Sequence, residues 1–334
     1  MTAAIEAHAR ALQEGVAEAR AGLVERETLV ELVALSAVAG EHMLVIGPPG
    51  TAKSEAIRRV AQALGGSYFE YLLGRFTEPS EIFGPVDLQR LRQGFVETAT
   101  AGMLPEADIA FLDEVFLGST AILNTLLSLL NERTFRRGHT AIKVPLRVCV
   151  GASNALPSDE LLAAFADRFL VRHFVEPIAH SRLEDLLEAG WDLQDRGVVA
   201  RASLADVDAL ARAARTVEMQ AVRPLLAQAV RSLRAADIEL SDRRIVKVQR
   251  LVAAAATLDG RQIASGADLW PIVFAVPTAE HQAQAREVLR ELLDESRNRA
   301  LTQAALEASR GPAARAMRIV ERAREILVAR PLEG

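Results

Sequence analysis

The stretch that decides the fold is "VIGPPGTAKSEAIRRV", residues 45–60. A short apolar run, 42–46, leads into a turn of glycine and proline, and an amphipathic helical pattern begins at Lys53. The order matches a phosphate-binding loop (glycine, four residues, glycine, lysine, then serine or threonine), with Ala52 where the second glycine is usual. Alanine is still small enough to let a phosphate approach the backbone, so the sequence predicts a phosphate-binding loop.

The residue types of this loop fit ATP and Mg²⁺ chemistry. Backbone N–H groups at the start of a helix cradle phosphate oxygens. Lys53 is expected to reach the β- and γ-phosphates, and the Ser54 hydroxyl is expected to ligate Mg²⁺. The expected nucleotide-binding residues of the loop are Gly47, Pro48, Pro49, Gly50, Thr51, Ala52, Lys53 and Ser54.

The chain around the loop predicts an α/β fold with a parallel five-stranded sheet. Short apolar runs separated by helical patterns are typical of buried parallel strands, and they occur at 42–47, 68–73, 109–114, 146–153 and 169–174. Two segments, 88–100 and 133–145, alternate around a glycine and predict β-hairpin insertions. We therefore expect an α/β core with two hairpins over 1–180, an all-α lid domain over 181–277 and a helical C-terminal tail over 278–334.

Composition argues against several other classes of protein. The net charge of -5 and the 4% of aromatic residues argue against a nucleic-acid binder that works by bulk charge or base stacking. We expect no membrane span, because the apolar runs are short, and no export signal, because the chain opens on a charged helical pattern. The single cysteine, Cys149, lies in an apolar run and is expected to be a buried core residue. These observations predict a cytoplasmic protein.

Two further strands are expected to end in catalytic residues. "IAFLDE" ends in Asp113, expected to hold Mg²⁺, and Glu114, expected to polarise the attacking water. Asn154 follows the run "CVGAS" and is expected beside the γ-phosphate, where it helps to place that water. The structural alternatives are an acidic helix cap for the carboxylates and a turn residue for the asparagine.

Arginines at two places in the sequence are candidates for supplying further positive charge at the phosphates of the nucleotide. Arg168 cannot easily reach a nucleotide in its own chain, but it could act on one bound by a neighbour, with Arg172 as the alternative. The structural alternative for Arg168 is a salt bridge to Asp167 or to another surface carboxylate. In the helical part, Arg243 is preferred over Arg244 as the residue that reports the γ-phosphate to the lid.

The order of these parts resembles AAA+ ATPases of the MoxR family, most closely the RavA-like branch. The similarity rests on "GPPGTAKS", "LPEADIAFLDE", "ILNTLLSLLNERTFRRG" and "ASNALP" followed by "FADRFLVR". It covers roughly residues 20–275, and in this branch alanine at position 52 is usual. The resemblance implies that the basic residues of the second hairpin, from Arg133 to Lys143, face a central pore or a client, with a solvated hairpin as the alternative.

The resemblance also implies a function. It suggests a ring, usually hexameric, that hydrolyses ATP at subunit interfaces and remodels a protein client, often with a von Willebrand factor A (vWA) domain partner. ATP/ADP and Mg²⁺ are the expected cofactors. Two alternatives remain open: a nucleotide-gated scaffold whose turnover is incidental, and a nucleic-acid motor, which the acidic balance disfavours.

Overall fold

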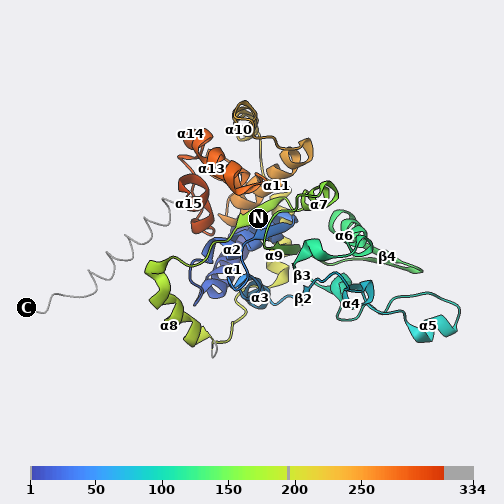
Figure 1. The fold of residues 1–334 in the computed structure, drawn as a ribbon. Coiled ribbons are helices and arrows are strands. Elements are labelled where there is room, and N and C mark those ends of the chain that lie inside the picture. The colour runs from blue at the N-terminus through green and yellow to red at the C-terminus, as the bar shows by residue number, and fades with distance from the viewer. Residues whose placement is uncertain (1, 194–195, 312–334) are drawn as a thin grey trace, which may run out of the picture.

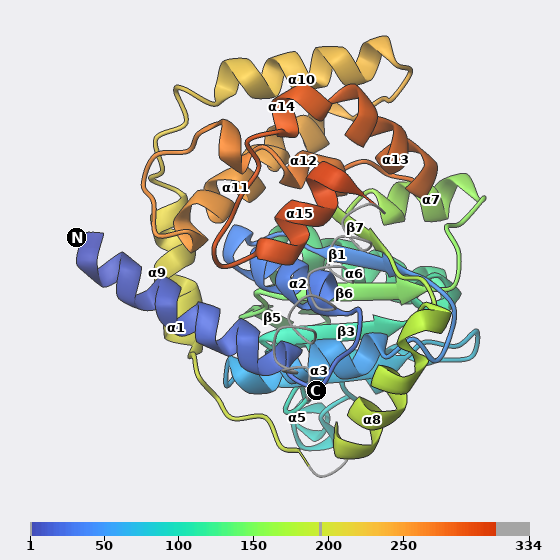
Figure 2. The same ribbon diagram turned by 90° about the vertical axis from the view of Figure 1, so that its left-hand side faces the viewer.

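The structure, a computed structural model, describes residues 2–193 and 196–311. Its centre is a five-stranded sheet in the order β2-β3-β6-β1-β7, with every neighbouring pair parallel. Figure 2 shows this sheet with helices packed around it. The strands are β1 (Met43–Ile46), β2 (Tyr68–Leu72), β3 (Ile109–Asp113), β6 (Val148–Ser153) and β7 (Val171–Phe174). The predicted parallel five-stranded α/β fold is confirmed.

Both faces of the sheet are covered. Along β1 the side chains alternate between two hydrophobic clusters, with Met43 and Val45 in one and Leu44 and Ile46 in the other. Alternation is a consequence of the two-residue repeat of a strand. Cys149 faces the second cluster and is buried, as predicted.

Helices and 3-10 turns connect the strands. Those before β7 are α1 (Thr2–Arg20), α2 (Glu27–Ala39), α3 (Lys53–Ala63), α4 (Pro79–Phe83), α5 (Leu88–Arg92), η1 (Leu104–Glu106), η2 (Val115–Leu117), α6 (Thr120–Glu132) and α7 (Glu160–Ala166). Those after β7 are η3 (His180–Arg182), α8 (Leu183–Leu193), α9 (Leu204–Ala214), α10 (Arg223–Ala235), α11 (Asp242–Leu258), η4 (Gly266–Asp268), α12 (Pro271–Phe274), α13 (Ala279–Val288), α14 (Arg290–Leu293) and α15 (Thr302–Arg310).

The prediction of two hairpins is half correct. The second forms from β4 (Thr134–Arg137) and β5 (Thr140–Lys143), which pair antiparallel. The first does not form: the segment contains α5, and an isolated bridge between Val86 and Thr98 is its only strand-like pairing in the described structure. The physical reason is local, because Asp87 caps the backbone N–H groups of Gln89 and Arg90 and so starts a helix.

The expected C-terminal tail is helical but not separate, as far as it is described. α15 packs against α2, and both belong to one hydrophobic cluster that also contains residues of α1, α9 and α11. The buried Glu31 of α2 accepts a hydrogen bond from the backbone N–H of Ala304 at 2.8 Å, and Thr28 donates to Glu307 at 2.8 Å. The segment up to Gly311 is therefore part of the folded body, and residues 312–334 lie outside the described structure.

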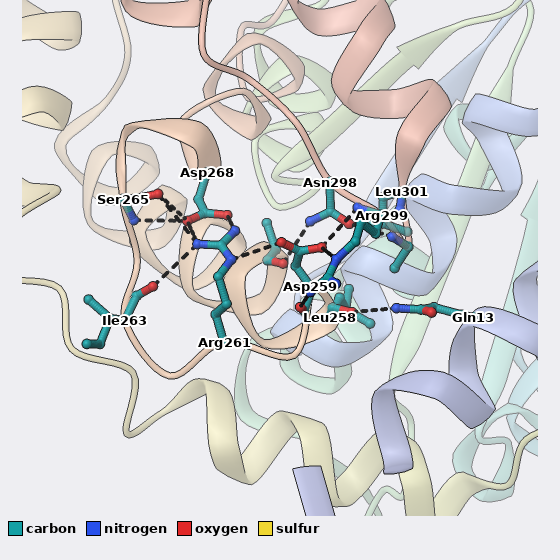
Figure 3. A network of polar contacts seen from close by, with 12 residues as sticks. Gln13, Leu258, Asp259, Arg261, Ile263, Ser265, Asp268, Asn298, Arg299 and Leu301 are labelled. Carbon is teal, nitrogen blue, oxygen red and sulfur yellow. Dashed lines mark hydrogen bonds and ion pairs between the residues drawn. The ribbon is translucent and has the colours of Figure 1, made fainter. Parts of the chain in front are cut away.

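The loop before α15 is also held by polar contacts (Figure 3). Asn298 donates to the carbonyl of Ala255, and the backbone N–H and side chain of Arg299 both donate to Asp259. Asp259 also pairs with Arg261 at 2.9 Å. These bonds join the loop to the C-terminal end of α11.

The buried Glu31 predicts a pH dependence of stability. Burial raises its pKa from about 4.5 to about 7, although Ala304 N–H and Arg20 favour the charged form. Between these values the folded chain binds a proton that the unfolded chain does not. The free energy of unfolding of the wild type, relative to Glu31→Gln, should therefore fall by up to about 1.4 kcal/mol per pH unit as the pH rises from about 4.5 to about 7, and level off above. Urea unfolding of both proteins across this range measures the difference, and a constant difference would contradict the assignment.

Candidate functional site

The predicted phosphate-binding loop connects β1 to α3, which is the strand–loop–helix order that its sequence pattern predicts. Gly47 must be glycine, because a Cβ there would lie 2.4 Å from the carbonyl oxygen of Val175, just after β7. Gly50 and Ala52 both have left-handed backbone, with φ of 75° and 55°. The sequence departs from the usual pattern at Ala52, which therefore adopts a conformation that costs an L-residue about 1–2 kcal/mol.

Lys53 lies folded back onto the loop. Its Nζ donates to the carbonyl oxygens of Gly47 and Pro48, each at 2.9 Å. Burial lowers the pKa of Lys53, and the charges of Asp113 and Glu114 act in the opposite direction. The two carboxylates are therefore close enough to Lys53 to interact with its charge.

Three neighbouring strands bring the expected catalytic residues together. In a parallel sheet all carboxyl ends meet at one edge, and β3, β6 and β1 are consecutive in the sheet order. Asp113 ends β3 and Asn154 follows β6. Asn154 Nδ2 donates to Glu114 Oε1 at 2.6 Å, and Asp113 Oδ1 accepts from the N–H of Glu114 at 3.0 Å.

Glu114 itself has strained backbone. Its φ of 49° is in the left-handed region, which disfavours residues with a Cβ. Such strain is common at functional sites, where it places a side chain that regular structure could not. Here it turns the carboxylate of Glu114 toward Asn154.

Arg26 is a residue that the sequence did not single out. It lies just before α2 and is almost fully buried. Its Nε donates to the carbonyl of Thr51 at 2.7 Å and one terminal nitrogen donates to the carbonyl of Glu176 at 3.0 Å. It therefore ties the phosphate-binding loop to the segment that leaves β7. An arginine within "VERETL" gives no sequence signal for this role.

Arg168 lies near the amino ends of the strands, whereas the loop lies at their carboxyl ends. It comes three residues before β7, and β7 starts level with the start of β1, because Val171 pairs with Met43. The loop follows the far end of β1, about 13 Å of strand away. Asp167 pairs with Arg244 instead, and the side chain of Arg168 forms no hydrogen bond or ion pair with any described residue.

The alternative Arg172 does not fit the role of a residue that reaches outward. It lies within β7, is buried, and donates to the carbonyl of Pro277 at 2.8 Å. Burial lowers its pKa to about 10. Arg172 therefore stabilises the interior of the fold.

The two arginines of α11 are also separated by their surroundings. Arg244 is buried and donates to Asp167 and to the carbonyls of Phe169, Leu170 and Ala275. Arg243 donates to Asn131 at 2.9 Å. The start of α11 lies beside the residues that precede β7, away from the loop of the same chain, and the role of Arg243 at the γ-phosphate stays a prediction.

The basic residues of the second hairpin divide into two groups. Arg133 and Arg137 donate to the backbone carbonyls of Gly40 and Gly84, so both have structural contacts. Arg136 and Lys143 are exposed. The hairpin therefore presents part of its expected charge to solvent.

A cavity of about 700 Å³ beside Asp259 and Arg299 is a second candidate site (Figure 3). Most of its charged groups already have partners, since Arg261 pairs with Asp259 and Asp268, and Arg299 pairs with Asp259; the side chain of Arg297 has no ion pair with a described residue. The cavity is thus lined mainly by a structural network of ion pairs.

The metal chemistry of the loop fits Mg²⁺. The described residues contain no cluster of three or more histidine, cysteine, aspartate or glutamate side chains that could hold a metal. Mg²⁺ needs no such cluster, because it binds through one or two protein oxygens together with phosphates and water. The Ser54 hydroxyl and the Asp113 carboxylate supply oxygens of this kind.

Together, the sheet order, the loop and the acidic strand end define an AAA+ fold. The crystal structure of a candidate ATPase from Cytophaga hutchinsonii has the same fold, with a TM-score of 0.70 over 88% of this chain and 96% of that one, at 16% identity. A family model described as the MoxR domain in the MoxR-vWA-beta-propeller ternary systems matches residues 10–212. The chain belongs to the MoxR family of AAA+ ATPases; its assignment to the RavA-like branch stays a prediction.

Curated proteins with similar sequences include two archaeal proteins and a MoxR chaperone. Two uncharacterised proteins of Methanocaldococcus jannaschii, MJ0812 and MJ0079, are 38% and 37% identical over 74% of this chain. The chaperone MoxR1 of Mycobacterium tuberculosis is 26% identical over 50% of the chain. The chain spans less than two thirds of the length of these relatives, covering 66%, 64% and 45% of them. No described helix is long and apolar enough to cross a membrane.

The loop geometry predicts opposite effects for two small substitutions. Gly47→Ala places a Cβ against the Val175 carbonyl and should cost about 1–3 kcal/mol in stability and weaken nucleotide binding. Ala52→Gly removes the Cβ from a left-handed position and should leave stability unchanged or raise it by up to about 1 kcal/mol. Thermal unfolding and titration with a fluorescent nucleotide test both, and equal effects would contradict the geometry.

Proposed function

We propose that this chain binds ATP and hydrolyses it with Mg²⁺ at an interface between subunits. The observation that carries the proposal is the meeting of Lys53, Glu114 and Asn154 at the carboxyl ends of three consecutive strands. This is the edge at which parallel sheets bind ligands. It combines phosphate binding with a carboxylate that can polarise water.

Each residue has a defined task in this proposal. The backbone N–H groups from Gly50 to Ser54 bind phosphate oxygens, and Lys53 exchanges its two loop carbonyls for the β- and γ-phosphates. Mg²⁺ held by Ser54 and Asp113 would neutralise phosphate charge. Glu114 accepts a proton from the attacking water, and Asn154 orients that carboxylate.

The remaining positive charge comes from a neighbouring copy. Arg168 is half-buried at the amino edge of its sheet, and its guanidinium group has no partner among the described residues, so it could act on a nucleotide bound by another chain. An arginine supplied in this way stabilises the charge of the transferring phosphoryl group. Arg243 lies at the same edge and could assist from the same side.

The wider role follows from the family. The family model's description names vWA proteins, and one relative is a chaperone. We infer a ring of subunits, expected to be hexameric and cytoplasmic, that remodels or assembles a protein client together with a vWA-domain partner. Residues 181–277 would then act as the lid of the nucleotide site.

Loss of the loop lysine tests nucleotide binding. Lys53→Ala should abolish ATP binding, since the only side-chain cation of the loop is removed. Calorimetric titration with ATP and Mg²⁺ measures the affinity, with Glu114→Gln as the matched variant that should still bind. Unchanged affinity in Lys53→Ala would refute the phosphate-binding role.

A mixing experiment tests the shared site. Arg168→Ala should bind ATP but lose turnover by about 10³-fold or more, as removal of an arginine finger does. Mixing it with the inactive Lys53→Ala chain should restore part of the activity, because each variant supplies the residue that the other lacks.

The controls use the same assay. Glu114→Gln gives the blank rate, and wild-type turnover per chain should rise with protein concentration. A mixture that stays at the blank rate while both variants still assemble would contradict action between subunits.

A further inference from the structure

Helix α8 presents an apolar stripe to solvent. Leu183, Leu187 and Trp191 follow one another at four-residue intervals, which places them on one face of the helix. Their exposed fractions are 41%, 75% and 80%, and no residue of the helix as described is buried. An exposed tryptophan among leucines is unusual for a lone surface, and tryptophan is enriched in the centres of protein interfaces.

A row of acidic side chains runs beside this stripe. Glu184, Glu188 and Asp192 are each one residue after a member of the apolar row, and they share its four-residue spacing. Asp185 is paired with Arg182, whereas these three have no ion pair with a described residue. The helix contains no basic residue, so its partner should be apolar with a basic rim.

The chain itself has a groove with these properties. Helices α10 and α11 form a groove of about 480 Å³ whose lining includes Leu226, Val230 and Ile245. Arg223, Arg231 and Arg234 of α10 line it as well, and all three are exposed; Arg234 is paired at 3.4 Å with Asp242, the acidic residue of the lining.

The two charge rows have matching lengths. Arg223 and Arg231 are eight residues apart on α10, as Glu184 and Asp192 are on α8, so each pair spans about 12 Å of helix. Arg231 forms no ion pair with a described residue. The apolar stripe and the acidic row could therefore meet the groove and its arginines at the same time.

α8 lies on the side of the phosphate-binding loop. The segment leading to it passes Gly47 at Val175 and is bound by Arg26 at Glu176. At its other end, Leu193 lies against Gly22, in the turn before α2.

The groove lies on the side of Arg168. Its residues Asp242 and Ile245 flank Arg244, which is bonded to Asp167. Figures 1 and 2 both place α8 and α10 at opposite ends of the molecule. The helix cannot enter the groove of its own chain.

We propose that α8 of one subunit docks into the α10–α11 groove of the next. The apolar stripe would cover the groove floor, and the acidic row would face the arginines. A head-to-tail contact between two different surfaces builds a ring when its rotation closes. It would also bring the Arg168 side of one chain to the loop side of the next, and in this respect it rests on the proposed function.

Charge reversal of the two rows tests the proposal. The triple variant Glu184→Arg, Glu188→Arg and Asp192→Arg has a basic α8 that faces a basic groove. The triple variant Arg223→Glu, Arg231→Glu and Arg234→Glu has an acidic groove that faces an acidic α8. Each alone should fail to assemble, with the association midpoint raised about ten-fold or more. An equal mixture of the two should assemble again, because each helix then meets a groove of opposite charge. Analytical ultracentrifugation with and without ATP measures assembly.

A matched control separates this contact from net charge. Glu280→Arg, Glu287→Arg and Glu291→Arg make the same change in charge on exposed residues of α13 and α14, and should assemble like the wild type. Trp191 provides an independent readout, because the other tryptophan, Trp270, is fully buried. Its emission should shift to the blue as the wild type assembles, and Trp191→Phe should remove the shift.

The outcomes distinguish this contact from the proposed function. If both reversed variants assemble like the wild type, or if the wild type stays monomeric with and without ATP, the docking proposal is wrong. If each reversed variant fails to assemble alone and the mixture of the two also fails, the docking proposal is again wrong. ATP affinity that depends on Lys53 would in each case leave the phosphate-binding role in place. Recovery by mixing, without any ATP turnover, would support the contact and contradict hydrolysis.

Discussion

The constraint on which the structure depends is that the strands of its central sheet all run in the same direction. All five strands are parallel, so the phosphate-binding loop, Glu114 and Asn154 meet at the carboxyl edge. The same geometry places whatever precedes β7, including Arg168, at the amino edge. One chain therefore has the two halves of the proposed site on opposite sides. A second copy is the simplest way to bring them together, and the proposed docking of α8 would be part of that arrangement.

Two buried arginines connect the sheet to the helices around it. Arg26 bonds the carbonyls of Thr51 and Glu176, and Arg244 bonds those of Phe169, Leu170 and Ala275. A guanidinium group suits this task because it carries five donors in one plane and stays charged when buried. The first arginine joins the loop to the start of the segment that leads into α8. The second fixes the start of α11, which borders the groove.

The helices after β7 differ in how they are held. α9, α11 and α15 share a hydrophobic cluster with α1 and α2, so they are continuous with the core. α8 is the exception, because Leu183, Leu187 and Trp191 face solvent and, among its residues, Leu193 alone packs against this cluster. Since burial of such residues is favourable, covering the exposed face of α8 would favour assembly.

The sequence by itself determined the features that local patterns encode. Short apolar runs predicted the five strands, and the spacing of Gly47, Lys53 and Ser54 predicted the loop, because each depends on residues adjacent in the chain. It did not find Arg26, nor distinguish α5 from a hairpin in a segment whose alternation fits both. Nor could it separate Arg243 from Arg244, or Arg168 from Arg172. Neighbouring residues of like chemistry look alike in sequence, and only tertiary packing decides that Arg172 and Arg244 are buried among backbone carbonyls while Arg168 stays half-buried with no partner among the described residues.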